Sequence, residues 1–223
     1  MPAYNEEKTI SEVIKRLKKV GLKILVVDDG STDRTYEIAK SLGAIVLRHK
    51  KNKGKGEALK TGISYLKKRK DVDNVVLIDA DMQFLPEESW KLLEPLEKKQ
   101  AEMVMGCRDF SKVPFRHRLG NWIWRTTFNL LFGTNFKDTN CGYMAFSKSA
   151  LKKIKNIHGG YIIENSFLEQ AIRKKIKIKQ VPVTVVYKKI SGLRRGIRVV
   201  LGVLIFIVIS GIKYRIDKLL KKI

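Results

Sequence analysis

Short apolar runs alternate with amphipathic stretches along the first part of the chain. Apolar residues recur every three or four positions between residues 10 and 20, which predicts a helix with one apolar face. A continuous apolar run follows at 24–27, as expected of a strand that is buried on both faces. The alternation continues with predicted helices at 35–42, 57–68 and 87–98, and predicted strands at 44–47, 75–78 and 103–105. This rhythm predicts an α/β fold, with helices on both faces of a mostly parallel sheet.

Acidic residues follow two of the predicted strands. Asp28 and Asp29 end the first apolar run, and Asp79 and Asp81 come directly after the run at 75–78. In open α/β sheets, ligands bind at the carboxyl ends of the strands. Two carboxylates in the order Asp-x-Asp after a buried strand point to one site, and a hard divalent cation prefers such oxygen ligands. A metal held there would neutralise a diphosphate leaving group. The alternative to a metal site is that the Asp-x-Asp sequence forms a solvated turn.

Composition adds an anionic partner to this picture. The 223 residues include 46 Lys and Arg against 22 Asp and Glu, a net charge of +24. This excess predicts binding to nucleic acid, a membrane surface or a phosphorylated substrate. A hydrophobic content of 44% excludes a disordered chain. The two cysteines give no disulfide framework, and no apolar signal run opens the chain, so a reducing, cytoplasmic-side location is expected.

Five motifs occur in a fixed order along the first 190 residues. They are Pro2-Ala3-Tyr4-Asn5-Glu6, Val26-Val27-Asp28-Asp29-Gly30-Ser31-Thr32-Asp33, Asn52 with Gly54-Lys55-Gly56, Asp79-Ala80-Asp81-Met82-Gln83, and Asp138-x-x-Cys141-Gly142-Tyr143. In this order the motifs resemble those of family 2 inverting glycosyltransferases, most closely the dolichyl-phosphate mannose or glucose synthases. The resemblance implies a GT-A fold, which is Rossmann-like, and a nucleotide-sugar donor. It also implies Mg²⁺ or Mn²⁺ and a polyprenyl-phosphate acceptor such as dolichyl phosphate.

The resemblance also implies roles for single residues. Asp79 and Asp81 would hold the metal on the diphosphate, with Gln83 as a further ligand. The residues that it places at the nucleotide and its phosphates are Pro2, Tyr4, Glu6, Val27, Asp29, Lys55, Ala80 and Arg194. For Lys55 the alternative is a solvated lysine, and for Arg194 it is contact with lipid headgroups.

The start of the sequence departs from the family pattern. Members of the family have an apolar strand before the Pro-x-Tyr-Asn-Glu segment, but here Met1 directly precedes Pro2. We therefore expect either a start upstream of Met1 or a sheet that lacks most of one strand beside the nucleotide.

An acceptor site is predicted in the basic, aromatic segment at 115–132. Guanidinium groups bind phosphate through paired donors, so Arg116, Arg118 and Arg125 are the candidates for a lipid phosphate. The resemblance places acceptor-phosphate arginines in the same region. For the aromatic residues of this segment, ordinary helix packing is the alternative interpretation.

Asp138 is expected near the acceptor by the same resemblance. A sugar hydroxyl would need a general base, but a phosphate monoester is already largely ionised at pH 7. We therefore expect Asp138 to orient the acceptor rather than to remove a proton. Glu164 and Glu169 fall on a predicted helix, where solvent-exposed positions are expected; one of them facing the site is the alternative.

The last 33 residues differ in composition from the rest. The stretch 199–212 has no charged residue and is flanked by Arg and Lys. Because a spanning helix needs about 20 apolar residues, an interfacial or re-entrant helix is expected, followed by a basic surface helix. The chain is thus divided into a catalytic domain at 1–190 and a membrane-associating tail at 191–223. Packing of the tail on the domain, or on a second copy in a homo-oligomer, is the alternative.

These features together predict a membrane enzyme at the cytoplasmic face of the cell membrane. It would transfer a sugar from GDP-mannose, UDP-glucose or UDP-GlcNAc to polyprenyl phosphate. Within the same class, the alternative is a glycosyltransferase that acts on a carbohydrate or lipid-linked hydroxyl. A basic nucleic-acid-binding protein is the alternative of another class. No nucleic-acid-binding motif is present, and basic residues concentrate beside the apolar tail, so nucleic acid is not the expected partner.

Overall fold

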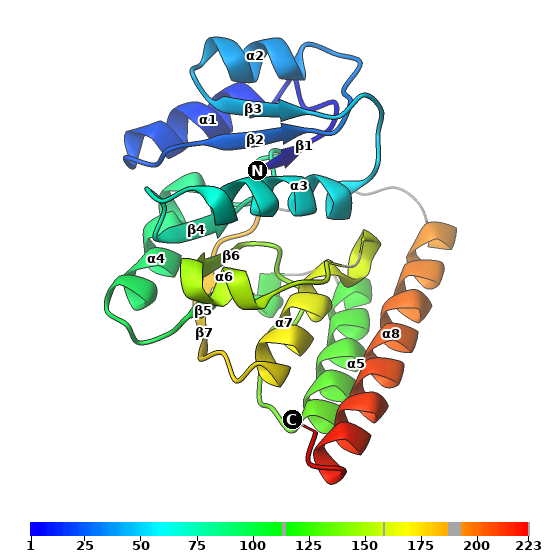
Figure 1. Cartoon of the computed structure of the whole chain (residues 1–223). Coiled ribbons are helices and arrows are strands. Elements are labelled where there is room, and N and C mark those ends of the chain that lie inside the picture. The colour runs from blue at the N-terminus through cyan, green and yellow to red at the C-terminus, as the bar shows by residue number, and fades with distance from the viewer. Residues whose placement is uncertain (113–114, 158, 187–192, 223) are drawn as a thin grey trace.

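The strands form two separate sheets in this computed structural model, which describes residues 1–112, 115–157, 159–186 and 193–222 (Figure 1). The first sheet is parallel and has the order β1-β2-β3. The second has the order β4-β6-β5-β7, in which β6 runs antiparallel to both neighbours. The strands are β1 (Pro2–Ala3), β2 (Leu25–Asp28), β3 (Ile45–Arg48), β4 (Asn74–Leu77), β5 (Met103–Arg108), β6 (Met144–Ser147) and β7 (Ile178–Val183).

Helices alternate with the strands as the hydrophobic pattern predicts. They are α1 (Ile10–Lys19), α2 (Thr35–Ser41), α3 (Lys55–Lys68), α4 (Ser89–Glu97), α5 (Phe115–Phe132), α6 (Lys148–Lys153), α7 (Ile163–Arg173) and α8 (Leu193–Leu219). Three short 3₁₀ helices lie among them in the described ranges, at Pro86–Glu88, Phe110–Lys112 and Gly160–Ile162. The apolar face of α1 is buried through Ile10, Val13, Ile14 and Leu17, which confirms that predicted helix.

Strand pairing brings the first two motifs together. Ala3 pairs with Asp28 across β1 and β2, and its carbonyl accepts a hydrogen bond from the Asp29 amide at 2.8 Å. The chain then turns at Gly30, whose φ of 75° favours glycine. A Cβ atom at Gly30 would lie 2.6 Å from the carbonyl carbon of Lys51. The turn after β2 and the loop after β3 are therefore in direct contact.

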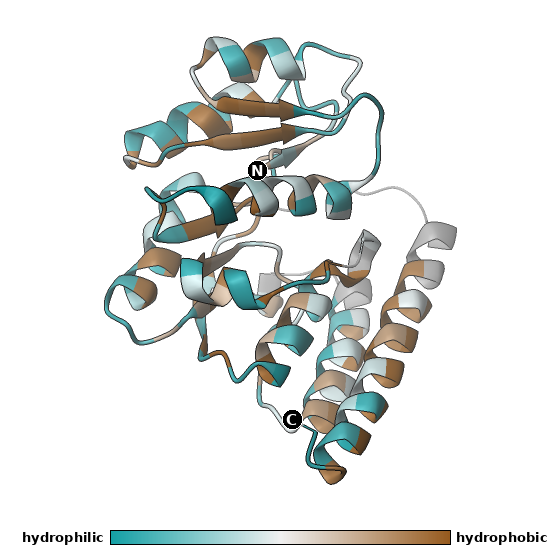
Figure 2. Ribbon diagram, in the orientation of Figure 1, coloured by the Kyte–Doolittle hydropathy of each residue, from teal (hydrophilic) through white to brown (hydrophobic). Residues whose placement is uncertain are grey.

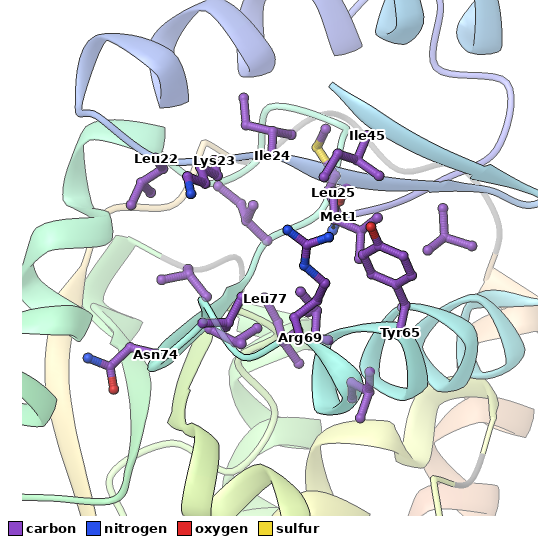
Figure 3. A pocket seen from close by; sticks show the side chains of 18 of the residues that line it. Met1, Leu22, Lys23, Ile24, Leu25, Ile45, Tyr65, Arg69, Asn74 and Leu77 are labelled. Carbon is purple, nitrogen blue, oxygen red and sulfur yellow. Dashed lines mark hydrogen bonds between the residues drawn. The ribbon is translucent and has the colours of Figure 1, made fainter. Parts of the chain in front are cut away.

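A groove separates β2 from β4 (Figure 3). It has a volume of about 290 Å³ and is lined largely by apolar side chains, among them Leu25 and Leu77, with Tyr65 and Arg69 of the α3 region beside them. The strand β1 has two residues and pairs with β2, while β4 pairs with β6. Within the described residues, the groove thus lies between the two sheets, beside the predicted nucleotide site.

The C-terminal helix α8 lies along α5 (Figure 1). The Trp124 indole N–H donates to the Val200 carbonyl at 3.0 Å, and the Arg215 guanidinium donates to the Leu131 carbonyl at 2.6 Å. Arg173 of α7 forms an ion pair with Asp217 at 2.6 Å. One face of α8 is thus attached to the catalytic part of the chain. Hydrophobic residues predominate along the middle of this helix (Figure 2).

Candidate active site

A cleft of about 310 Å³ opens where β1, β2 and β4 end. Its lining comprises Pro2, Ala3, Tyr4, Glu6, Asp29, Asn52, Gly54, Lys55, Ala58, Asp79, Ala80 and Asp81. Most of the predicted donor residues and two of the three predicted metal ligands, Asp79 and Asp81, therefore meet at one place. Val27 instead lines the neighbouring groove between β2 and β4. Arg194 is in α8, but its side chain lies outside the described part of the structure.

Lys55 forms an ion pair with the first aspartate of the Asp-x-Asp motif. Its ammonium lies 2.8 Å from Oδ2 of Asp79 and 3.8 Å from Oε1 of Glu164. Burial alone would lower the pKa of the Lys55 ammonium, but the charges of Asp79 and Glu164 outweigh burial and raise that pKa. Lys55 is thus an ion-paired cation in the lining of the cleft, with its side chain 36% exposed.

Glu164 is turned toward the cleft, so the solvent-exposed position expected for it is wrong. Burial raises the pKa of its carboxyl above the ordinary range, and the Lys55 ammonium opposes that rise. A Cβ atom at Gly142 would lie 3.2 Å from Glu164 Oε1 and 3.5 Å from Asp79 Oδ2. Gly142 therefore lets the backbone of the Cys-Gly-Tyr motif lie against this charged group. Glu169, one turn further along α7, pairs with Arg173 at 2.9 Å.

The two aspartates fit a metal that also binds a diphosphate. Oδ1 of Asp81 accepts a hydrogen bond from the Gln83 amide at 3.0 Å. Among the described residues, no group of three or more His, Cys, Asp or Glu side chains gathers into a metal cage. Two carboxylates at an open cleft suit Mg²⁺ or Mn²⁺, because such a cation takes its other ligands from phosphate oxygens and water. Gln83 follows this pair, but it is absent from the described lining of the cleft.

A second cleft, of about 340 Å³, lies beside α5. Phe110, Arg118, Leu119, Asn121, Trp122 and Arg125 line it. Two of the three predicted acceptor arginines are therefore brought together with an exposed tryptophan. Arg116 is in the same helix, but its side chain lies outside the described part of the structure. Phe128, by contrast, is fully buried and serves helix packing.

Asp138 is paired with Arg108, a residue that the sequence analysis missed. The carboxyl group of Asp138 is 1% exposed and accepts hydrogen bonds from Nε and Nη2 of Arg108 at 2.6 and 2.8 Å. Nη2 of Arg108 also donates to Oδ1 of Asn121, which lines the second cleft. Arg108 ends β5, so a charged residue after an apolar strand, the signal that marked the aspartates, would have identified it.

Polar contacts extend from each cleft toward α7 and β5. At the first cleft, Lys55 lies 3.8 Å from Glu164 of α7. The next residue of α7, Asn165, donates to Oδ1 of Asn140 at 2.7 Å, and the backbone N–H of Asn140 donates to Oδ1 of Asp138 at 3.0 Å. Asp138 is bound by Arg108, which donates to Asn121 in the lining of the second cleft. Consecutive residues of α7 thus contact a group beside each cleft.

The motifs, the two clefts and the fold agree with one family of enzymes. Residues 1–155 match the sequence model described as glycosyl transferase family 2. The chain belongs to glycosyl transferase family 2. Its membership confirms the resemblance seen in the motif order and makes the protein a glycosyltransferase, in place of the nucleic-acid-binding alternative.

Two relatives within glycosyl transferase family 2 carry names that concern lipid phosphates. The chain is 34% identical to the UDP-N-acetylglucosamine–dolichyl-phosphate N-acetylglucosaminyltransferase of Methanococcus voltae, over 92% of this chain and 91% of that protein. It is 28% identical to the polyprenol monophosphomannose synthase of Mycolicibacterium smegmatis, over 82% of this chain and 75% of that protein.

The solved structure of another protein has the same fold as this chain. Glucosyl-3-phosphoglycerate synthase from Mycobacterium tuberculosis, in complex with Mn²⁺, UDP-glucose and phosphoglyceric acid, matches with a TM-score of 0.76. The match covers 94% of this chain and 77% of that chain, at 23% sequence identity. The GT-A fold predicted from the sequence is thereby confirmed.

Proposed function

We propose that the protein transfers a sugar from a nucleoside-diphosphate sugar to polyprenyl phosphate, with inversion at the anomeric carbon. The donor would be GDP-mannose, UDP-glucose or UDP-GlcNAc, and the acceptor dolichyl phosphate or a related lipid. One observation supports this function above the others: the same chain has an acidic cleft at the strand ends and a second cleft that holds arginines and an exposed tryptophan. The first suits a nucleotide with its metal, and the second suits a phosphate on an apolar chain.

On the donor side, Asp29 and the segment Pro2–Glu6 would bind the nucleoside, with the backbone of Ala80 beside it. Lys55 would lie near the diphosphate as a fixed positive charge. A divalent cation bound by Asp79 and Asp81, with Gln83 as a proposed further ligand, would supply positive charge to the departing diphosphate. Arg194 completes the proposed donor set.

On the acceptor side, the arginines would position the lipid phosphate. An oxygen of that phosphate forms the new bond to the anomeric carbon, while the bond to the nucleoside diphosphate breaks and the diphosphate leaves with its electron pair. Because a phosphate monoester is already ionised near pH 7, no side chain needs to remove a proton. Asp138 would orient Arg108, and Arg116, Arg118 and Arg125 would bind the phosphate. Catalysis would then depend on positioning and on charge stabilisation.

A panel of donors and acceptors tests this function. GDP-mannose, UDP-glucose and UDP-GlcNAc, each radiolabelled in the sugar, are incubated with Mg²⁺ and either dolichyl or undecaprenyl phosphate. We expect one donor to give label that partitions into organic solvent and that mild acid releases. Label on a carbohydrate hydroxyl, with none on either lipid phosphate, would instead support the hydroxyl-acceptor enzyme.

We further propose that α8 lies in the surface of the membrane at its cytoplasmic face. By length and composition, Val199–Leu219 is the one helical stretch in the described ranges that is apolar enough to cross a bilayer. Its exposed apolar stripe comprises Leu201, Ile205, Ile209, Ile212, Ile216 and Leu219. The opposite face is packed through Val203 and Ile207 and is tied by Asp217 to α7. A spanning orientation would take this ion pair toward the hydrocarbon, which is costly, so an in-plane helix fits better.

The bilayer proposal predicts the effect of charge on the exposed stripe. An Ile205→Asp/Ile209→Asp protein should bind vesicles with 30% anionic lipid at least roughly tenfold more weakly, because each buried isoleucine contributes about 1.5–3 kcal/mol. Vesicle flotation at fixed salt measures this binding. The matched control is Trp90→Asp, since Trp90 is equally exposed but lies on α4. Equal flotation of the stripe variant and the control would contradict the in-plane helix.

A further inference from the structure

His49 is buried between the donor cleft and helix α3. It follows β3 directly, and its side chain is 8% exposed. Nδ1 of the ring lies 2.6 Å from Oδ1 of Asp29, and Nε2 lies 2.8 Å from Oγ1 of Thr61 in α3. Because an ionised carboxylate only accepts hydrogen bonds, we assign the Nδ1 proton to the bond with Asp29. The ring therefore links a residue of the cleft to a rigid helix.

The carboxylate of Asp29 has most of its acceptor positions filled by one loop. Besides His49, Oδ1 accepts from the Lys53 amide at 3.0 Å, and Oδ2 accepts from the Gly54 amide at 2.7 Å. A carboxylate oxygen accepts about two hydrogen bonds, and from the described residues Oδ2 accepts the one from Gly54, which leaves a position for a hydroxyl or N–H group of a ligand. Asp29 lines the donor cleft. Its orientation therefore decides where that remaining position points.

The backbone donors of this loop are fixed independently of His49. The loop is closed over Gly30, where a Cβ atom would lie 2.6 Å from the Lys51 carbonyl carbon. At its end, Gly54 has a φ of 90°, a conformation that favours glycine, and it precedes the first turn of α3. His49 thus supplies a side-chain donor to Asp29 in addition to the two backbone N–H donors of Lys53 and Gly54. A hydrogen bond to an ionised group is stronger than one between neutral groups, so loss of the imidazole donor would leave the carboxylate less firmly oriented, held by the two backbone N–H groups alone.

We propose that His49 is a positioning residue that aims the free acceptor position of Asp29 at the nucleoside of the donor. The inference rests on the proposed donor site. Since His49 and Asp29 are joined on the nucleoside side, while Lys55, Asp79 and Asp81 form the diphosphate side, His49 sets affinity for the nucleoside and not for the diphosphate. Thr61 holds the ring in this orientation through Nε2.

Separate measurements of nucleotide binding and pyrophosphate binding distinguish effects on the nucleoside side of the donor site from effects on its diphosphate side. Calorimetry is done with GDP, UDP and inorganic pyrophosphate, each with Mg²⁺, on the unaltered protein and on His49→Leu, His49→Asn and Thr61→Val. We expect His49→Leu to raise the Kd of the nucleotide about tenfold and to leave that of pyrophosphate nearly unchanged. His49→Asn should recover most of the affinity, because the amide N–H of asparagine takes the place of Nδ1–H. Thr61→Val should lie between the two, and donor KM should rise more than kcat falls.

Three outcomes would overturn the inference. The first is a nucleotide Kd for His49→Leu and Thr61→Val equal to that of the unaltered protein. The second is an equal loss of nucleotide and pyrophosphate binding with a lowered Tm, which indicates a purely structural role. The third is an unaltered protein that binds neither nucleotide, which also overturns the donor site itself. If His49→Leu does not fold, Thr61→Val and His49→Asn still give the comparison.

Discussion

Replacement of Asp81 by Ala should abolish sugar transfer. Asp79 and Asp81 are the carboxylate pair at the donor cleft, and Asp79 is already balanced by Lys55. Removing Asp81 would leave the proposed divalent cation with one protein carboxylate, which would weaken its binding and remove its charge from the departing diphosphate. A metal that supplies several kcal/mol to the transition state makes the expected loss about 10³-fold in kcat/KM. Transfer of radiolabelled sugar into extracted lipid measures it.

A second measurement separates the metal from the fold. The Tm of the unaltered protein with UDP or GDP should rise on addition of Mn²⁺, and that rise should be absent in Asp81→Ala. Asp71→Ala is the matched control, since Asp71 pairs with Arg69 and Lys23 at the surface. The control should keep both the activity and the Mn²⁺ response. Activity of Asp81→Ala equal to that of the control would exclude Asp81 as a metal ligand.

The donor side could be predicted from the sequence because its signals are local. A buried apolar run identifies each parallel strand, and the carboxyl ends of parallel strands meet at one edge. Asp29 and Asp79 were therefore expected to lie close together, and the structure brings both to one cleft although β2 and β4 belong to different sheets. The direction of β6 could not be predicted in this way, because an apolar run gives burial but not the orientation of a strand.

The contacts that tertiary packing creates were the ones missed. Arg108 and Asp138 are 30 positions apart, and no local pattern pairs them. Glu164 faces Lys55 because α7 buries its apolar face, and helix periodicity shows which face is buried but not which polar group accompanies it. The apolar stretch and the basic tail, predicted as separate helices, form the single helix α8. Position 211 in this helix needs glycine, because a Cβ atom there would lie 2.6 Å from the Cβ atom of Leu131 in α5 and would clash with it.

The ion pair of Arg108 and Asp138 leads to the second large expected effect. Asp138→Ala should lower the free energy of unfolding by about 3–5 kcal/mol, because it leaves the guanidinium of Arg108 buried without its partner. The side chain of Arg108 is 16% exposed, so water compensates little of this loss. Urea unfolding followed by circular dichroism measures the change. The exposed pair of Lys98 and Glu94 offers a control: Glu94→Ala should change the free energy of unfolding far less than Asp138→Ala, because water solvates both of its charges.

A double variant then distinguishes an orienting role from that of a base. Asp138→Ala/Arg108→Met removes both charges and should recover most of the lost stability, since no buried guanidinium is left without the Asp138 carboxylate. It should not recover sugar transfer, because the proposed orientation of the acceptor phosphate depends on Arg108. If Asp138 were a base, Asp138→Ala would abolish turnover beyond what its stability loss explains, and Arg108→Met would keep turnover. Those results would support an enzyme that acts on a hydroxyl acceptor, because a base must remove the proton of the hydroxyl as it attacks the sugar.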